Sequence, residues 1–331
     1  MIPPSFLVIQ TAFIGDVILA TALVEKLHQH FPQANIDFLV RKGNEDLLNN
    51  HPHLRNVLVW DKKKDKIQHL LKIIGEVRSY RYDYVVNVHR FASSGLITAF
   101  SGARNRIGFN KNPLSFFFTK TVKHEIKEGI HEVDRNQTLI ESITNRNASK
   151  PKLCPSRADE DRIASLTKSG KYVCIAPTSV WFTKQWAKEK WIELLDLFCQ
   201  EPVTVYLLGA HSDKKFCEEL ITSSKNKQVT NLCGELTLLQ SAALMKNAAM
   251  NYVNDSAPLH LASAMNAPTT AIYCSTVPAF GFGPLSDNSR IIETQEKLDC
   301  RACGLHGFKT CPEKHFKCAF TIEAKQLLER V

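Results

Sequence analysis

One acidic side chain stands where a proton acceptor could work. Asp16 and Gly15 lie between the apolar run 6–10 and the apolar-periodic stretch 17–31, a pattern that indicates strand, tight turn and helix. An Asp at this position most commonly caps the helix N-terminus. The functional alternative is a carboxylate that the helix dipole keeps ionised and that accepts a proton. Taken alone, the pattern favours the cap.

A second polar segment, 176–186, follows one predicted strand and precedes a predicted helix. It carries three hydroxyls, on Thr178, Ser179 and Thr183, and the ammonium group of Lys184. These groups suit phosphate binding, with the lysine as a point charge and the hydroxyls as donors. The segment lacks the GxxxxGK[ST] frame of a Walker A loop. A surface loop whose tryptophans pack on the domain is the alternative.

A third segment, 254–262, also joins a strand to a helix. Asp255 and Ser256 open this helix, whose first free N–H groups form an anion site. A capping role for Asp255 explains part of the pattern without any ligand. Taken alone, the position of His260 within an otherwise apolar helix favours a core histidine. The turn at 208–213 repeats the strand–glycine–helix pattern more weakly.

The elements that position these residues alternate along the chain. Apolar runs at 6–10, 36–40, 57–60, 84–88 and 107–109 predict strands separated by helices, and the same rhythm resumes at 172–176 after a Pro- and Asn-containing stretch at 144–171. Such alternation predicts parallel sheets covered on both faces. We therefore predict an α/β chain with two doubly wound, Rossmann-like domains, 1–150 and 151–331, facing each other across a cleft. Ligands of such sheets bind beyond the carboxyl ends of the strands.

Charge is unevenly distributed over 331 residues with a net charge of +9. Residues 1–150 hold 21 Lys and Arg against 14 Asp and Glu, and the remainder holds 21 against 19. A basic N-terminal half attracts phosphorylated substrates, anionic lipid or nucleic acid, although a solvated lysine-rich surface gives the same numbers. The start of the chain lacks a signal-peptide pattern, and no apolar run reaches the ~18 residues of a membrane span, so we expect a cytoplasmic protein.

Four of the ten cysteines cluster near the C-terminus. Cys300, Cys303, Cys311 and Cys318 have the spacing C-x2-C-x7-C-x6-C, with two histidines nearby. In a reducing compartment this set is compatible with a tetrahedral structural zinc site. Packed thiols or a disulfide formed on purification are the alternatives. The other six cysteines are scattered in apolar surroundings and are expected to act as small buried hydrophobes.

The order of these segments resembles the lipopolysaccharide heptosyltransferase family, from about Phe6 to the C-terminus. The matching pieces are IQTAFIGDVILATAL, APTSVWFTKQWAKEKWIEL, LLGAHSDKKFCEEL, LCGELTLLQSAALMKNA, NDSAPLHLASAMNAPTTAIY and the cysteine segment. The resemblance implies a GT-B fold, with the acceptor bound by the N-terminal domain and the nucleotide sugar by the C-terminal domain. It also implies transfer with inversion and no metal or cofactor required for catalysis.

Carried over by position, the resemblance makes Asp16 the general base and Lys184 the cation at the donor phosphates. It places Asp255, Ser256 and His260 at the donor site, to which the loop hydroxyls of Thr178, Ser179 and Thr183 also belong. Ala257 stands where the family usually has Gly, Thr178 where a Pro-Gly pair is common, and Ala22 where a Pro is usual. Because the Ala257 side chain narrows the turn expected to bind the phosphates, the pattern does not decide which nucleotide sugar is the donor.

The expected reaction moves heptose from ADP-heptose to an inner-core lipopolysaccharide precursor, an anionic glycolipid. The expected acceptor-binding cations, taken to lie beyond a strand end, are Arg104, Arg106, Lys111 and Lys120. We expect peripheral contact with the cytoplasmic face of the inner membrane and no nucleic-acid partner. The alternatives are a same-fold enzyme using another nucleotide sugar for a surface polysaccharide, and a non-catalytic lipid-binding module. A nicotinamide or flavin enzyme is disfavoured because no G-x-G-x-x-G follows the first strand.

Overall fold

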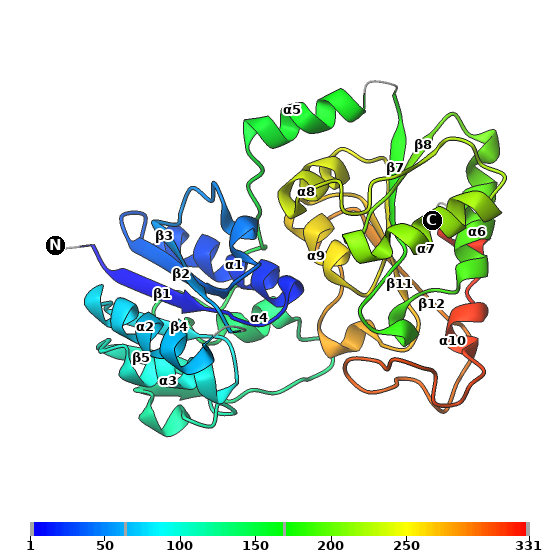
Figure 1. The fold of residues 1–331 in the computed structure, drawn as a ribbon. Coiled ribbons are helices and arrows are strands. Elements are labelled where there is room, and N and C mark those ends of the chain that lie inside the picture. The colour runs from blue at the N-terminus through cyan, green and yellow to red at the C-terminus, as the bar shows by residue number, and fades with distance from the viewer. Residues whose placement is uncertain (1–2, 63–64, 168–169, 329–331) are drawn as a thin grey trace. The chain divides into compact units, whose positions relative to one another are not determined.

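The computed structural model describes residues 3–62, 65–167 and 170–328, and the chain divides into two compact units, Met1–Cys154 and Pro155–Val331 (Figure 1). The sequence places the boundary after residue 150. Each unit is a six-stranded parallel sheet with helices on both faces.

The first unit alternates strands and helices from its start. Helices α1 and α4 lie on one face of its sheet, and α2 and α3 on the other (Figure 1). The elements are β1 (Ser5–Ile9), α1 (Ile14–His30), β2 (Asn35–Arg41), β3 (Asn56–Trp60), α2 (Lys66–Ser79), β4 (Tyr84–Asn87), α3 (Ala92–Phe100), β5 (Asn105–Phe109), β6 (Lys120–Val122) and α4 (Glu132–Gln137).

The second unit repeats the plan. Helices α5, α8 and α9 pack together on one face, and α6 and α7 on the other. The elements are α5 (Arg157–Leu166), β7 (Tyr172–Ala176), α6 (Lys188–Leu197), β8 (Thr204–Leu207), α7 (Lys214–Ser223), β9 (Val229–Asn231), α8 (Leu238–Lys246), β10 (Asn251–Asn254), α9 (Ala257–Ala264), β11 (Thr269–Tyr273), β12 (Ser289–Glu293) and α10 (Lys317–Phe320). Short 3₁₀ turns complete both units, among them η2 (Ser115–Phe117) and η3 (Phe182–Lys184).

The two sheets have the same strand order. The first runs β3-β2-β1-β4-β5-β6, and the second, read from β9, runs β9-β8-β7-β10-β11-β12. Both are the Rossmann order, in which the chain reverses direction of travel between the first and fourth strands and leaves a crevice at their carboxyl ends. The switch points therefore lie between β1 and β4 in one unit and between β7 and β10 in the other.

Buried apolar residues explain why the central strands are parallel and covered on both faces. Strands β7 and β11 are buried along their whole length, as expected when helices cover both sides of a sheet. In the second unit, Trp186 and Trp191 meet edge to face at 4.9 Å in the core. The prediction that tryptophans of the 176–186 segment pack on the domain is thus confirmed for Trp186.

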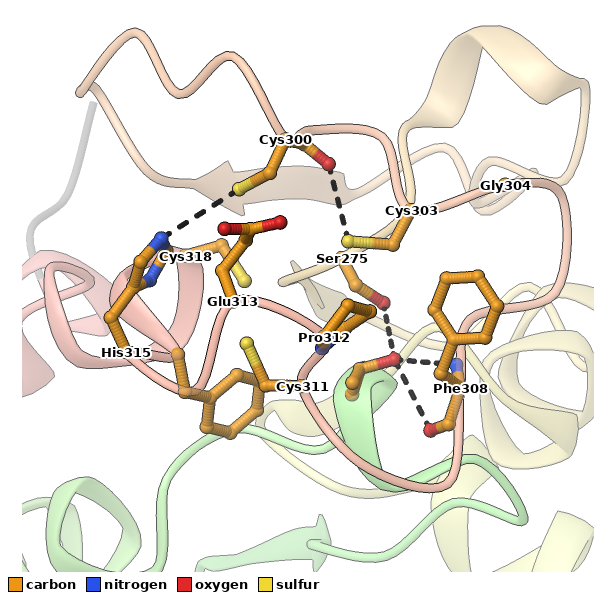
Figure 2. Close-up of a pocket in the computed structure, with 12 residues that line it drawn as sticks. Ser275, Cys300, Cys303, Gly304, Phe308, Cys311, Pro312, Glu313, His315 and Cys318 are labelled. Atoms are coloured by element: carbon orange, nitrogen blue, oxygen red, sulfur yellow. Dashed lines mark hydrogen bonds between the residues drawn. The ribbon is translucent and has the colours of Figure 1, made fainter.

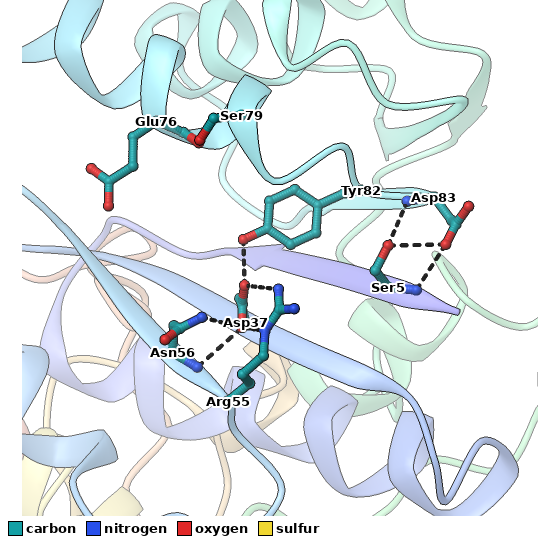
Figure 3. A network of polar contacts seen from close by, with 8 residues as sticks. All are labelled: Ser5, Asp37, Arg55, Asn56, Glu76, Ser79, Tyr82 and Asp83. Carbon is teal, nitrogen blue, oxygen red and sulfur yellow. Dashed lines mark hydrogen bonds and ion pairs between the residues drawn. The ribbon is translucent and has the colours of Figure 1, made fainter. Parts of the chain in front are cut away.

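A buried polar network holds the amino edge of the first sheet, the edge opposite its switch-point crevice (Figure 3). The Asp37 carboxylate on β2 is fully buried, and it accepts from the Arg55 guanidinium at 2.6 and 3.0 Å and from the Tyr82 hydroxyl. Beside it, the Asp83 carboxylate accepts from the Ser5 amide and hydroxyl, both at 2.9 Å. Because its charge is paired and its hydrogen bonds are made, this network serves the structure.

The structure differs from the expected elements in several places. Strands β6 and β12 and helices α3 and α4 went unpredicted, because they are short or half-exposed and lack a clear apolar period. Helix α1 begins at Ile14, so Gly15 lies in its first turn and the predicted tight turn at Gly15 is wrong. Across the described ranges, no helix is both long enough and apolar enough to span a bilayer.

Candidate active site

At the switch point of the second sheet, Lys184 and Asp255 form an ion pair. Lys184 lies in the turn after β7 and Asp255 directly after β10, which brings Nζ to 2.7 Å from Oδ2. Asp255 is buried, and the Thr276 hydroxyl donates to the same carboxylate oxygen at 2.7 Å. The carboxylate therefore fixes a lysine whose side chain is 15% exposed. One of the three ammonium donors is used in this pair, and two can meet phosphate oxygens.

Asn254 locks together the two loops that carry this pair. Its side-chain amide donates to the Pro177 carbonyl at 2.8 Å, and its carbonyl oxygen accepts from the Trp186 amide at 3.0 Å. The side chain is fully buried, so both contacts are shielded from water. Asn254 was not among the site residues predicted from the sequence, although its place at the end of β10 carried the signal.

The predicted donor hydroxyls are placed differently from one another. Thr178 and Ser179 are partly exposed on the loop after β7, and the Ser256 hydroxyl lies 3.5 Å from the Thr178 carbonyl. Thr183 is buried, and its hydroxyl contacts Phe308 and Ser275. A hydroxyl committed to these partners holds the loop, so the structure does not bring Thr183 together with the exposed pair.

His260 lies in the second turn of α9 and is buried, with its ring edge-on to Phe282 at 6.3 Å. The Phe282 carbonyl in turn accepts from the Tyr273 hydroxyl at 2.8 Å. This packing behind the first turn of α9 fits the core-histidine interpretation. A role at the donor stays a prediction.

At the switch point of the first sheet, Asp16 takes part in the cap of α1, and its role as a proton acceptor stays a prediction. Its carboxylate accepts from the Phe13 amide at 3.2 Å, which caps α1. Burial raises the pKa of the Asp16 carboxyl above its ordinary value, and the Phe13 hydrogen bond and the Arg90 and Arg41 guanidinium groups oppose that rise. A carboxylate with a raised pKa is a stronger proton acceptor than an exposed one.

Three cations that sequence reasoning missed lie at the same sheet edge as Asp16, and two of them, Arg41 and Arg90, act on its carboxylate. Arg41 ends β2, Lys62 follows β3, and Arg90 follows β4, so all three lie at the carboxyl edge of the sheet. The Arg41 guanidinium stands 5.0 Å from the Phe13 ring, and neither Arg41 nor Arg90 makes an ion pair within the described ranges. The rule that selected Asp16, applied to the ends of β2, β3 and β4, would have found them.

Burial and mutual repulsion perturb the groups beside these cations. Lys62 donates to the Thr11 carbonyl at 2.8 Å, and burial, followed by Arg41, lowers its pKa to about 8. The Thr11 hydroxyl also contacts His89 Nδ1 at 3.1 Å, and burial, followed by Lys62, lowers the pKa of His89 to about 3. His89 is therefore neutral at pH 7 and adds no charge to this edge.

Glu132 is a second buried carboxylate near this edge. It starts α4 and pairs with Arg135 at 2.6 and 2.9 Å. Burial raises the pKa of Glu132, Arg135 opposes the rise, and the charge of Asp16 adds to it. The ion pair with Arg135 lies within α4 and commits Glu132 to that helix, while the Asp16 side chain is partly exposed.

The four predicted acceptor cations fall on two different edges. Lys111 follows the carboxyl end of β5, whereas Arg104 and Arg106 stand at its amino end and Lys120 begins β6. Arg106 donates to the backbone carbonyls of Ala103 and Phe117, and Lys120 donates to the Ser142 hydroxyl. The premise that Arg104 and Arg106 lie beyond a strand end is wrong, because β5 extends back to Asn105.

The four C-terminal cysteines line one pocket of about 280 Å³ together with Glu313 and His315 (Figure 2). All ten cysteines are free thiols. Cys300 Sγ lies 3.9 Å from His315 Nε2. As placed, no three His, Cys, Asp or Glu side chains of the described residues have the geometry to hold a metal ion. The four cysteines therefore line one pocket, and zinc binding by them stays a prediction.

Comparison with known proteins links this architecture to one enzyme family. The model of glycosyltransferase family 9 (heptosyltransferase) matches residues 70–307. Lipopolysaccharide heptosyltransferase 3 of Escherichia coli K12 is 27% identical over 292 residues, covering 83% of each chain. Among solved structures, a family 9 glycosyltransferase from Veillonella parvula superimposes with a TM-score of 0.88 at 20% identity, covering 99% of this chain and 96% of that one. E. coli ADP-heptose LPS heptosyltransferase II gives 0.82 at 21% identity, with 98% and 96% covered. The fold is therefore the GT-B fold.

Proposed function

Since the chain belongs to glycosyltransferase family 9 (heptosyltransferase), we propose that it transfers heptose from ADP-heptose to an inner-core lipopolysaccharide acceptor. The enzyme is a glycosyltransferase; its donor, acceptor and base are the proposal. The observation that carries the proposal is the content of the two switch points. The first holds the Asp16 carboxylate near two arginines, and the second holds Lys184 fixed by the buried Asp255. The names of relatives that act on lipopolysaccharide support the acceptor class.

The second unit binds the donor diphosphate. Lys184 meets the phosphate oxygens, and the ion pair with Asp255 holds the lysine ammonium group in place before the nucleotide arrives. The partly exposed hydroxyls of Thr178 and Ser179 and the first N–H groups of α9 complete the site. These donors are strongest where negative charge develops, on the departing diphosphate, and so stabilise the transition state.

The first unit supplies the base. Asp16 takes the proton of an acceptor hydroxyl while that oxygen bonds to the anomeric carbon of heptose. The bond from the same carbon to the diphosphate breaks, ADP leaves with the electron pair, and the anomeric configuration inverts. Lys184 provides the positive charge at the leaving group, so the proposal includes no catalytic metal.

Phosphates and acidic sugars of the acceptor are met by cations at the carboxyl edge of the first sheet. We assign this role to Arg41, Lys62 and Arg90, with Lys111 from the original set. Arg41 and Arg90 make no ion pair within the described residues, so an anionic ligand need not displace an existing partner. Such charge-assisted contacts to phosphate are among the stronger hydrogen bonds.

Contact with the inner membrane is assigned to three exposed aromatic rings. Phe100, Phe116 and Phe117 are 49, 73 and 46% exposed, and Phe117 lies 6.4 Å from Phe100 and 4.3 Å from Phe116 between ring centroids. Arg106 donates to the Phe117 carbonyl and places a basic group beside these rings. Aromatic rings beside basic groups suit the surface of an anionic bilayer, here its cytoplasmic face.

A panel of nucleotide sugars tests the donor. The purified protein is incubated with a lipopolysaccharide precursor lacking the outer heptoses and with ADP-heptose, ADP-glucose or UDP-sugars, and transfer is followed by mass spectrometry. We expect addition of one heptose from ADP-heptose alone. Transfer from another nucleotide sugar would support the second candidate, which Ala257 at the start of α9 favours because its methyl narrows the phosphate turn. Absence of transfer from every donor, with retained vesicle binding, would support a lipid-binding module.

A further inference from the structure

The loop that carries the four cysteines, residues 299–318 (the cysteine loop), is clamped to the segment that carries Lys184. The Phe308 amide donates to the Thr183 hydroxyl at 2.7 Å, and the Thr183 amide donates back to the Phe308 carbonyl at 3.1 Å (Figure 2). Thr183 is 1% exposed. These two bonds are therefore shielded from water, and they join the residue next to Lys184 to a chain segment 125 residues away.

Ser275 makes the clamp three-sided. Its hydroxyl donates to the Thr183 hydroxyl at 3.0 Å, and its amide donates to the Thr183 carbonyl at 3.3 Å. Its own carbonyl accepts from the Cys303 amide at 2.8 Å. The first two cysteines are thus tied to the end of β11 by the same serine that holds Thr183.

Gly307 shows how closely the cysteine loop approaches Lys184. Its φ of +74° is one that side chains rarely adopt, and a Cβ there would lie 2.9 Å from Thr183 Oγ1 and 3.3 Å from Lys184 Cγ. Only a glycine fits without moving either neighbour. The stem of Lys184 therefore packs against the cysteine loop on one side, while its ammonium group meets Asp255 on the other.

The four thiols lie on the far side of this clamp. The sulfur atoms of Cys300, Cys303, Cys311 and Cys318 point toward the same part of the pocket, beside the Glu313 carboxylate (Figure 2). Cys318 is anchored in the core through α10, and Cys303 donates to the Cys300 carbonyl at 3.2 Å. A change of χ1 moves a sulfur between staggered positions without moving the backbone. Metal binding would require such a change, because the described side chains as placed include no group of three with ligand geometry.

We propose that Cys300, Cys303, Cys311 and Cys318 bind one thiophilic cation, with Zn²⁺ as the probe, and that filling this site fixes the cysteine loop against Thr183 and so sets the position of Lys184. The coupling part rests on the proposed role of Lys184 at the donor phosphates. Binding forms four metal–sulfur bonds and releases the four thiol protons to solvent, with no change of oxidation state.

Metal content tests the site independently of activity. Protein purified under reducing conditions is analysed for zinc and iron, then treated with a chelator and reloaded with Zn²⁺. We expect about one metal per chain, a lower Tm after chelation and recovery on reloading. The double variant Cys303→Ser, Cys311→Ser should lose the metal, whereas Cys199→Ser, a half-buried thiol outside the loop, should retain it. Protein that neither carries metal nor takes up Zn²⁺ would overturn the proposal.

ADP affinity tests the coupling. We expect chelation to weaken ADP binding by about 5-fold or more, measured by calorimetry, and reloading to restore it. Gly307→Ala should weaken ADP binding to a similar extent while the metal content stays at one, because its methyl displaces Thr183 and the Lys184 stem. Unchanged ADP affinity in both experiments would overturn the coupling. If Lys184→Ala itself left ADP affinity unchanged, the proposed donor site would fail, while the metal content would still decide the cation site.

Discussion

The two sheets share a strand order, but their carboxyl edges carry charge in different ways. In the second unit the charge of Lys184 is already neutralised, because the lysine pairs with the buried Asp255. The Thr276 hydroxyl donates to the same carboxylate. In the first unit Arg41 and Arg90 make no ion pair within the described residues, and they stand near a carboxylate whose ionised form burial disfavours. The second edge therefore holds its lysine in a fixed ion pair, whereas the two arginines of the first edge make no such pair among the described residues.

The proposed roles account for this difference. If the second edge binds the leaving diphosphate, which has the same shape in every turnover, a rigid donor set lowers the barrier most. If the first edge binds the anionic acceptor, cations on separate loops can meet its phosphates and carboxylates individually. Four experiments test this difference between the two edges.

The largest effect is expected from Asp16→Asn. Turnover should fall by roughly two to four orders of magnitude, because an amide cannot accept the proton. The amide oxygen can still accept from the Phe13 N–H, so the cap on α1 should persist. Folding should not suffer at neutral pH: a group with a raised folded pKa loses its stabilising contribution as pH rises through that pKa, and Asn carries no such loss.

The measurement pairs a transfer assay with a thermal melt and ADP titration of the same protein preparation. An Asp16→Asn enzyme with near-normal turnover would reduce Asp16 to a helix cap. A collapse in Tm would mean that the cap, and not the base, explains any lost activity.

Lys184→Ala should act on binding and rate together. Loss of a charge-assisted contact costs about 1.5–3 kcal/mol, so the Kd for ADP should rise roughly 10- to 150-fold. The change also leaves Asp255 buried without its cation. Lys214→Ala serves as the matched control, because Lys214 makes a 2.8 Å ion pair with Glu235 on the exposed surface of the same unit. Equal ADP affinities of the two variants would place Lys184 outside the donor site.

The sequence named more residues at this second edge than at the first. Lys184, Asp255 and Ser256 lie in segments that the family resemblance singled out, and the structure places Lys184 and Asp255 2.7 Å apart. Arg41, Lys62 and Arg90 end or closely follow three apolar strands, but no resemblance pointed to them and the strand-end rule was not applied there. The amino-end position of Arg104 was hidden because β5 begins on polar residues, which carry no apolar signal.

Contacts made through the cysteine loop were beyond the reach of local pattern. The Thr183 hydroxyl looked like a phosphate donor because its neighbours were polar. Its partner Phe308 is 125 residues away, in a loop without periodicity. The fold class, in contrast, depends on strand–helix alternation, which survives errors of several residues at each boundary.

The acceptor edge is tested by comparing Arg90→Ala with Arg104→Ala. Arg90 follows β4 at the carboxyl edge, and Arg104 precedes β5 at the amino edge, and both are exposed. We expect Arg90→Ala to raise the KM for the acceptor roughly 10-fold, as for a lost contact to a charged group, while ADP affinity stays unchanged. Arg104→Ala should leave that KM within about 2-fold. The reverse ranking would return acceptor binding to the amino edge.

The smallest effect concerns pH, and Arg90 allows it to be tested on Asp16 itself. Asp16 accepts a proton only when ionised, so kcat/KM should fall as pH drops through its pKa. The Arg90 charge stabilises the carboxylate and opposes the rise caused by burial. Removing it should raise the pKa of Asp16 further, and the acidic limb of the profile should move to higher pH by about half a unit to one unit.

Profiles of kcat/KM between pH 4.5 and 8.5 for the native enzyme, Arg90→Ala and Arg104→Ala measure this shift, with the Arg104 variant expected to follow the native curve. A limb that stays in place or moves to lower pH in Arg90→Ala would mean that another group controls it. The free cations would then serve the acceptor alone and not the base.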